Sequence, residues 1–372
     1  MNWLRKRRTR FAVTALVVNR RSTEKSSPGH DGAAANASRE QADRMNRRRL
    51  LEFIAAGGLA GGVTLLRAQP AAAMPRIGVL SFGTAPSGAD PDPSAGFRRG
   101  LRELGYAEGR NLVVEYRYAD GRPDRLAALA AELVQLKVRV ILAGGPAPLQ
   151  AARNATSTIA IVAMAGQDPV EEGWAQSLAR PGGNVTGLTV TFPELGPKQL
   201  ELLQQAVPGL ARVAVLLAPA ELTKGHQILE AGARALGLQL QMLEVSAPDD
   251  FEAAFKRATH GRAQGLYAID TNTIVTHRSR LAQMAVSARL PSVSGFALLA
   301  EAGFLMSYGA DLDALGRRAA TYVDKILKGA RPGDLAIERP TEFELVINRK
   351  TAGAFGITLP KSLLLRADRV IQ

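Results

Sequence analysis

The chain has 372 residues, a length that suggests two domains of ordinary size. Hydrophobic residues make up 46% and charged residues 22%, which excludes a mainly disordered or fibrous chain. The sequence contains no cysteine, so disulfide scaffolds, iron–sulfur clusters, thiol nucleophiles and a lipid-anchored N-terminal cysteine are also excluded.

The net charge of +13 is concentrated at the N-terminus. Residues 1–74 hold 14 Lys and Arg against 5 Asp and Glu, whereas residues 75–372 hold 33 against 29. The body of the protein is therefore nearly neutral. A nucleic-acid partner is not expected, because such a partner would require a basic face on the folded part of the chain.

Residues 45–73 have the pattern of a secretory signal peptide. Arg47–Arg49 form a cationic start, residues 50–66 are apolar and small, and small residues follow. We expect cleavage after Ala68 or Ala73, which would place the protein in the periplasm without a lipid anchor. The segment 46–51 also resembles a twin-arginine signal, so Sec and Tat export both stay open. An uncleaved membrane anchor is the alternative.

Residues 1–44 precede this signal. Since signal peptides belong at the start of a protein, Met45 is expected to be the initiator and 1–44 a mis-annotated or disordered extension.

After residue 75, short apolar runs alternate with amphipathic helical patterns, first up to a break at 180–187 and then again beyond it. We expect strands near 76–81, 112–118, 138–143, 159–164, 213–217, 238–245, 265–269, 292–294, 304–308 and 343–347. Alternation with tight connections predicts the α/β class, with two doubly wound, parallel-sheet lobes. In such sheets, ligands bind beyond the carboxyl ends of the strands.

Several stretches, in this order and spacing, carry a resemblance to a known family: 77–80, 96–101, 104–106, 167–170, 179–187, 198–203, 322–329, 343–348 and 364–368. The body from Pro75 to Gln372 resembles the ABC-transporter substrate-binding proteins of the tryptophan/tyrosine-binding type, which have the type I periplasmic-binding fold.

The resemblance implies two lobes joined by a three-strand hinge, with passages near 186–190, 294–304 and 331–341. Lobe 1 would be 75–186 plus 304–330, and lobe 2 would be 187–303 plus 331–372. It also implies a monomeric receptor that clamps a small amino-acid-like, polar or aromatic solute. The receptor would deliver this solute to an ABC permease and its ATPase in the inner membrane.

Strand-end position and the family pattern together indicate the ligand-binding residues Ser81, Phe82, Gly144, Gly145, Ala147, Gln167, Asp168, Asp270, Asn272, Tyr308 and Asp311. Asp168 could accept a hydrogen bond from an ammonium group of the ligand or could cap a helix. Asp270 and Asn272 could bind the ligand or form Asx-turns. Phe82 and Tyr308 could line the cleft or pack in the core, and the glycines could form plain turns.

No dinucleotide fingerprint, phosphate loop or GxSxG elbow is present, so we expect no enzyme activity and no cofactor. No metal is expected, because the histidines are scattered; His226 and His277 are expected to be solvated. A receptor for a membrane sensor and, less favoured, a secreted α/β enzyme are the alternative functions.

Overall fold

Two β-sheets organise the part of the chain that the computed structural model describes, which comprises residues 74–86, 92–165, 168–189, 194–218 and 224–372. The first sheet is entirely parallel, with the order β2-β1-β3-β4-β5. Its strands are β1 (Arg76–Ser81), β2 (Val113–Tyr118), β3 (Val140–Gly144), β4 (Ala160–Ala165) and β5 (Val185–Thr189).

The second sheet has the order β12-β11-β10-β9-β8-β6-β7. Its strands are β6 (Arg212–Leu217), β7 (Gln239–Glu244), β8 (Gly265–Ala268), β9 (Ser292–Ser294), β10 (Met306–Ala310), β11 (Phe343–Asn348) and β12 (Arg369–Ile371). All neighbouring strands are parallel except β10 and β11, which are antiparallel. The predicted alternation of strands and helices is confirmed, with this one antiparallel pair added.

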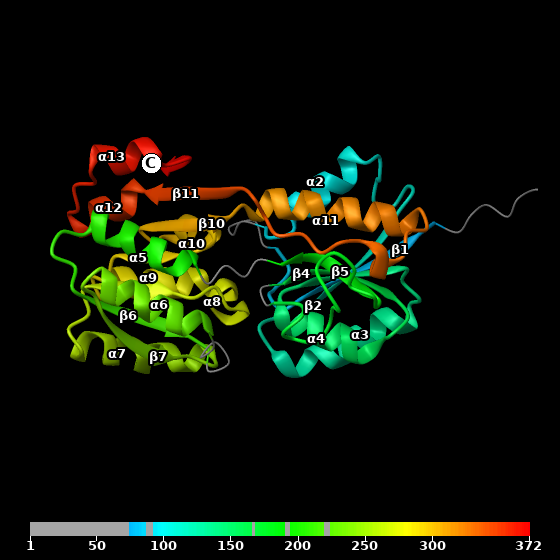
Figure 1. The fold of residues 1–372 in the computed structure, drawn as a ribbon, viewed down its shortest axis with the longest axis horizontal. Helices are drawn as coiled ribbons and strands as arrows, with labels where there is room; N and C mark the ends of the chain where they lie inside the picture. The colour runs from blue at the N-terminus through cyan, green and yellow to red at the C-terminus, as the bar shows by residue number, and fades with distance from the viewer. Residues whose placement is uncertain (1–73, 87–91, 166–167, 190–193, 219–223) are drawn as a thin grey trace, which may run out of the picture. The chain divides into compact units, whose positions relative to one another are not determined.

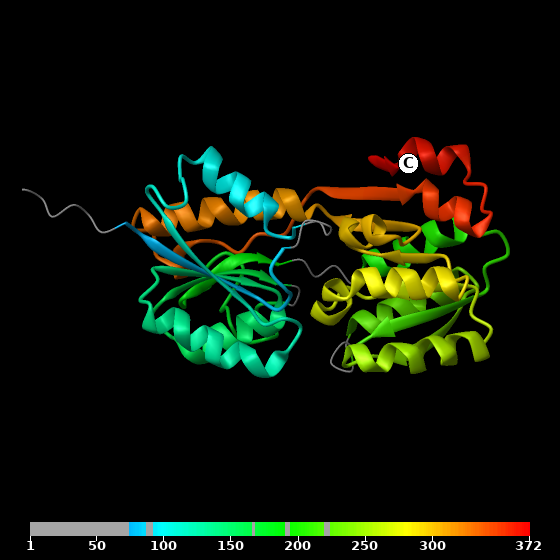
Figure 2. The same cartoon turned by 180° about the vertical axis from the view of Figure 1, so that it is seen from behind.

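Helices cover both faces of the first sheet (Figure 2). They are α2 (Ala95–Glu103), α3 (Leu126–Gln135), α4 (Pro146–Ala155) and α11 (Leu312–Leu327). Neighbouring strand residues point to opposite faces. Leu80 and Ile141 therefore pack on the side of α3 and α4, while Val79 and Val140 pack on the side of α2 and α11. Such strands, buried on both faces, explain the continuous apolar runs in the sequence.

The second sheet is covered in the same way. Its helices are α5 (Leu195–Ala206), α6 (Lys224–Ala235), α7 (Phe251–His260), α8 (Asn272–Thr276), α9 (Arg278–Ser287), α10 (Ala297–Ala302), α12 (Arg349–Phe355) and α13 (Lys361–Arg366). Val213 and Val215 pack with the leucines of α5, and Ala214 and Leu216 pack with α7 and α9. Three short 3₁₀ turns complete the described structure: η1 (Pro123–Arg125), η3 (Pro248–Asp250) and η4 (Pro332–Asp334).

The chain passes between the two sheets three times. It leaves the first sheet between β5 and α5, returns between β10 and α11, and leaves again between Glu338 and β11. The predicted second passage at 294–304 is wrong, because β10 pairs in parallel with β9 and so belongs to the second sheet. Residues 304–310 therefore do not join lobe 1, while α11 does pack against the first sheet.

Helix α11 lies directly against α2, although the two are far apart in the sequence (Figure 1). Besides side-chain contacts such as the ion pair of Arg99 with Asp313, the backbones themselves come close together. A Cβ atom at Gly96 would lie 2.3 Å from the carbonyl oxygen of Asp313, and one at Gly316 would lie 2.6 Å from the amide nitrogen of Phe97. At Gly100 the corresponding distance to the Cα atom of Arg317 is 2.8 Å. Glycine is therefore required at all three positions for the helices to approach so closely.

Gly96→Ala is expected to destabilise the protein, even though alanine favours a helix, because the new methyl group meets the fixed backbone of α11. We expect a loss of about 1–3 kcal/mol in the free energy of unfolding. Gly353→Ala in α12 is the matched control, since nothing lies within 4 Å of its Cβ position; it should gain about 0.5–1 kcal/mol. Urea unfolding of both variants measures the difference, and equal effects would contradict the backbone contact.

Candidate functional site

A cavity of about 710 Å³ lies between the two sheets, at the carboxyl ends of their strands. The first sheet contributes the turns after β1, β2 and β3, and the second contributes the turns after β8 and β9 together with α5 and α8. The wall includes Ser81, Phe82, Gly83, Tyr118, Gly121, Gly144, Gly145, Ala147, Met164, Gln199, His226, Tyr267, Asp270, Thr271, Asn272, Thr276, Arg278 and Phe296. This volume is typical of a small-molecule site.

Asp270 is a carboxylate in the cavity wall. It follows β8, and its Oδ2 accepts a hydrogen bond of 2.8 Å from the amide of Gly295 in the turn after β9. The amide of Phe296 donates to Oδ1 at 3.5 Å. Burial raises the pKa of Asp270 to about 7, although both amides act in the opposite direction. No ion pair involves Asp270 within the described residues, so its charge is held by backbone dipoles alone.

Asn272 begins helix α8 and also lines the cavity. The preceding Thr271 caps this helix, its Oγ1 accepting from the amide of Ile274 at 3.2 Å. A Cβ atom at Gly145, which follows β3 in the first sheet, would lie 2.3 Å from Asn272 Oδ1. Asn272 therefore lies against the Gly145 turn of the first sheet.

The predicted residues of the first sheet lie along the opposite wall. Ser81, Gly144, Gly145 and Ala147 follow β1 and β3 and line the cavity. The Ser81 hydroxyl accepts a hydrogen bond of 3.3 Å from the amide of Gly83, which stabilises the turn after β1. Backbone thus forms much of this wall, which lets a ligand approach closely.

Aromatic rings supply the apolar part of the wall. Phe82 is only 6% exposed and belongs to the core, so the structure gives it both of its expected roles. Tyr118 at the end of β2 stacks on Tyr116, with ring centroids 6.1 Å apart and nearly parallel planes. Burial, followed by the nearby Asp92 carboxylate, raises the pKa of Tyr118, so its phenol stays neutral and can donate a hydrogen bond.

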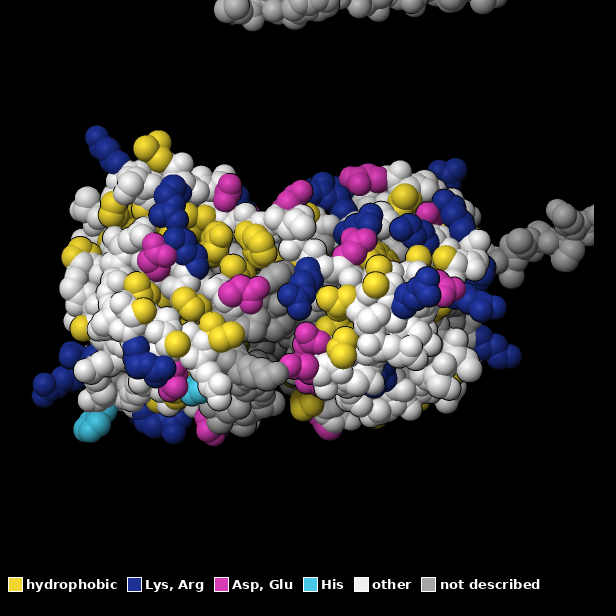
Figure 3. Space-filling view, viewed as in Figure 1, with side chains coloured by type: hydrophobic (Ala, Val, Ile, Leu, Met, Phe, Trp, Pro, Cys, Tyr) yellow, Lys and Arg dark blue, Asp and Glu magenta, His cyan; other side chains and the backbone are white. Residues whose placement is uncertain are grey.

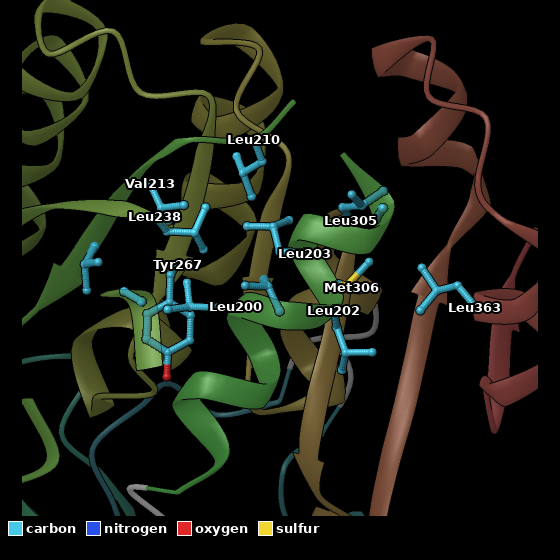
Figure 4. Close-up of a cluster of buried hydrophobic side chains, with 14 of the residues drawn as sticks. Leu200, Leu202, Leu203, Leu210, Val213, Leu238, Tyr267, Leu305, Met306 and Leu363 are labelled. Carbon is cyan, nitrogen blue, oxygen red and sulfur yellow. The ribbon is translucent and has the colours of Figure 1, made fainter. Parts of the chain in front are cut away.

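A buried polar chain lies under the wall of the second sheet. The hydroxyl of Tyr267 donates to Gln199 Oε1 at 2.6 Å, and Gln199 Nε2 donates to the carbonyl of Tyr308, also at 2.6 Å. Figure 4 shows Tyr267 beside the leucine cluster of α5, with its hydroxyl pointing away from the cluster. These bonds fix α5 against β8 and β10, and so fix the shape of the wall.

Three predicted site residues do not line the cavity. Asp168 caps a turn, accepting from the amides of Val170 and Glu171 at 2.9 and 3.2 Å. Asp311 caps helix α11 in the same way, accepting from the amide of Asp313 at 2.8 Å. Tyr308 packs with the hydrophobic cluster of the second sheet. These residues form the framework rather than the wall.

Gln167 and the expected cleavage positions Ala68 and Ala73 lie outside the described residues.

Several wall residues were not expected. His226 was expected to be solvated but lines the cavity, with its Nε2 atom 3.2 Å from Glu230. Arg278 lines it too, is 6% exposed, and donates to the carbonyl of Val275 at 3.0 Å. Both come from helices, which the strand-end rule does not cover. Tyr118 does end a strand, so that rule could have found it.

Charged side chains of both signs are mixed on the face of the molecule that Figure 3 shows, with Lys and Arg scattered over it. Among the residues with described positions, no group of three or more His, Asp or Glu is arranged to hold a metal ion. The described helices also include none with the length and apolar character needed to cross a membrane.

Two α/β halves linked by three passages, with a cavity at the carboxyl ends of both sheets, define a solute receptor with the two-lobed type I periplasmic-binding fold. The chain belongs to the family of ABC transporter substrate binding proteins, whose model matches residues 77–371. Members of this family are extracytoplasmic receptors rather than enzymes.

Known proteins place the chain near receptors for aromatic amino acids. It is 28% identical over 261 residues to the tyrosine-binding protein of Clostridioides difficile, a match covering 70% of this chain and 75% of that protein. A Streptococcus pneumoniae ABC domain solved in complex with L-Trp is 26% identical, with a TM-score of 0.72. A conserved domain protein from Vibrio cholerae is 29% identical, with a TM-score of 0.73. Each of these two matches covers 80% of this chain and 99% of the chain in the solved structure.

The raised pKa of Asp270 predicts how its replacement changes stability with pH. Its folded pKa of about 7 exceeds the unfolded value of 3.8, so its contribution to stability falls as the pH rises through 7. Asp270→Asn removes this penalty. The difference in melting temperature, variant minus wild type, should therefore increase between pH 5 and pH 8.

Asp250→Asn is the control. The amides of Ala247 and Ser246 lower the pKa of Asp250, so this carboxylate stays ionised from pH 5 to pH 8. The difference in melting temperature between Asp250→Asn and the wild type should therefore not change with pH in this range. Parallel pH trends for the two variants would contradict the assignment.

Proposed function

We propose that this protein is an exported receptor that binds an aromatic or similarly apolar amino acid and delivers it to an ABC importer. The observation that carries the proposal is Asp270, a carboxylate without an ion pair among the described residues, set in a cavity with aromatic walls. The ligand would be held with its ammonium group at this carboxylate and its side chain against the rings.

Charge supports an ammonium group at Asp270. A buried carboxylate is costly unless a cation or hydrogen bonds compensate for the lost water. Two backbone amides compensate only partly, since the pKa is still raised to about 7. A ligand cation would supply the missing compensation and would hold the carboxylate ionised. The ligand would therefore bind to the ionised form of Asp270, which is the form that burial disfavours in the empty cavity.

The walls support an apolar body next to that charge. Phe82, Tyr118, Met164 and Phe296 offer faces or edges on which a planar ring can pack. Relatives named for tyrosine and solved with L-Trp point the same way. A cavity of about 710 Å³ is larger than either amino acid, so a somewhat larger relative of these ligands also fits.

The remaining binding residues in this proposal are Ser81, Asn272 and the backbone of Gly144, Gly145 and Ala147. Asp168, Tyr308 and Asp311 hold the surrounding turns and helix. A single receptor molecule would close around the solute and present it to the permease, with transport driven by the ATPase. Family membership supports this role.

Asp270→Asn should weaken binding of L-tryptophan or L-tyrosine by about ten- to a hundredfold, because a charge-assisted hydrogen bond is lost from a buried site. Asp168→Asn should leave affinity nearly unchanged, since Asp168 caps a turn outside the cavity wall. Isothermal titration calorimetry on protein starting at Gln69 gives both values. Full affinity in Asp270→Asn would refute the role of this residue, and no binding by the wild type would refute the ligand class.

Export is tested by the N-terminus of the mature protein. If residues 45–73 act as a cleaved signal, mass spectrometry of the periplasmic fraction should find a chain starting at Gln69 or Met74. Replacing Arg47 and Arg48 together by lysine should block export only if the twin-arginine route is used. A full-length chain retained in the cytosol would contradict the proposed location.

A further inference from the structure

One short segment of the second sheet's half, residues 272–277, faces three glycine turns of the first. Gly83 follows β1, Gly121 follows β2 and Gly145 follows β3. These strands are adjacent in the order β2-β1-β3, so the three turns form one row. The segment, which we call the docking segment, consists of helix α8 and His277.

The row and the docking segment are in contact at every turn. A Cβ atom at Gly83 would lie 3.5 Å from Thr276 Oγ1. At Gly121 it would lie 3.2 Å from His277 Nε2 and 3.6 Å from Thr276 Cγ2. At Gly145 it would overlap Asn272 Oδ1 at 2.3 Å. At Gly83 a Cβ atom would make an ordinary contact, whereas at Gly121 and Gly145 the space for one is already taken by the opposite half.

Several contacts hold the docking segment to its own half. Thr271 caps its N-terminus. The ring of His277 packs edge-on against Phe251, with centroids 5.9 Å apart, and the guanidinium of Arg280 lies 5.6 Å from the centre of the same Phe251 ring. Ile274 is buried in the core beneath. A side chain added at Gly121 or Gly145 would therefore meet the docking segment before the two halves reach this contact.

We propose that the docking segment and the glycine row form the contact on which the two halves close, and that Gly121 and His277 are positioning residues for ligand capture. Gly121 lines the cavity and His277 does not, so His277 acts on the ligand only through closure. The effect on ligand affinity rests on the proposed receptor function, because closure matters for affinity only if the cavity binds a ligand. A receptor that closes less readily has a lower apparent affinity, in proportion to its closed fraction.

The first test traps the contact without any ligand. The chain has no cysteine, so Gly121→Cys with Thr276→Cys introduces one pair of thiols. An ideal Cβ atom at Gly121 lies 3.6 Å from Thr276 Cγ2, an atom whose place a cysteine sulfur at 276 can take, so the closed halves bring the two thiols within reach of each other. Gly105→Cys with Thr276→Cys is the control, because Gly105 also has a positive φ but no atom within 4 Å of its Cβ position. Mild oxidation should cross-link the first pair and not the second. Equal rates would overturn the proposal.

The second test measures affinity for L-tryptophan in Gly121→Asn and Gly105→Asn. Asparagine tolerates the positive φ of +74° and +86° at these turns, so both variants carry similar backbone strain. Gly121→Asn should bind about tenfold more weakly, while Gly105→Asn should match the wild type. Adding His277→Ala to Gly121→Asn should restore much of the loss. Equal melting temperatures for the two single variants separate closure from misfolding.

The outcomes are distinguishable from those of the proposed function. If the wild type binds neither tryptophan nor tyrosine but the 121–276 pair cross-links, the ligand class fails and the docking contact stands. If tryptophan binds but Gly121→Asn matches Gly105→Asn, the positioning role fails and the ligand class stands.

Discussion

The close contact between α2 and α11 is the constraint on which the architecture depends. Helix α11 comes from the far end of the chain, yet it completes the hydrophobic layer over the first sheet. Glycine at positions 96, 100 and 316 allows the two backbones to touch, which no larger residue would permit. Because α11 is followed by β11 in the second sheet, this contact also positions the start of the third passage, which runs from Glu338 to β11.

The segment after α11 is fixed by hydrogen bonds to the first sheet. The amide of Glu338 donates to the carbonyl of Gly187, and the amide of Thr189 donates back to Glu338. Tyr322 of α11 donates its hydroxyl to the carbonyl of Ala336 at 2.6 Å. The passage to β11 is therefore anchored on β5 beside the cavity. The ends of the two sheets face each other because the chain that joins them is held at both sides.

The cavity illustrates how binding and stability oppose each other. Asp270 weakens the empty protein at neutral pH, since burial disfavours its charge. The same uncompensated charge would attract a cation. The polar chain from Tyr267 through Gln199 to Tyr308 is fully paired and contributes rigidity instead. In the proposed function Asp270 would serve recognition, whereas the hydrogen-bonded chain holds the shape of the wall.

Much of the fold was predictable because its signals are local. Apolar runs indicated the strands, and the strand-end rule placed Ser81, Gly144, Asp270 and Asn272 along the cavity. The cap at Asp168 was among the expected alternatives, whereas Asp311 was expected only as a ligand-binding residue and caps α11. The sheet to which β10 belongs was not predictable, because pairing partners are non-local.

The wall residues that come from helices were missed for a similar reason. Gln199, His226 and Arg278 reach the cavity only through the way α5, α6 and α9 pack on the second sheet. Periodicity shows which face of a helix is apolar, but not which of its polar residues lies near a ligand.

The three passages between the sheets also bear on how the polypeptide can be divided. A protease that cut any one of them would leave the halves covalently connected through the other two, so nicked molecules should still migrate together under native conditions. Neither half is a continuous stretch of chain, since α5 to β10 of the second half separate α11 from the first sheet, and α11 in turn separates β11 and β12 from the rest of the second sheet. Any fission or recombination of such a receptor must therefore exchange at least two stretches of chain at once.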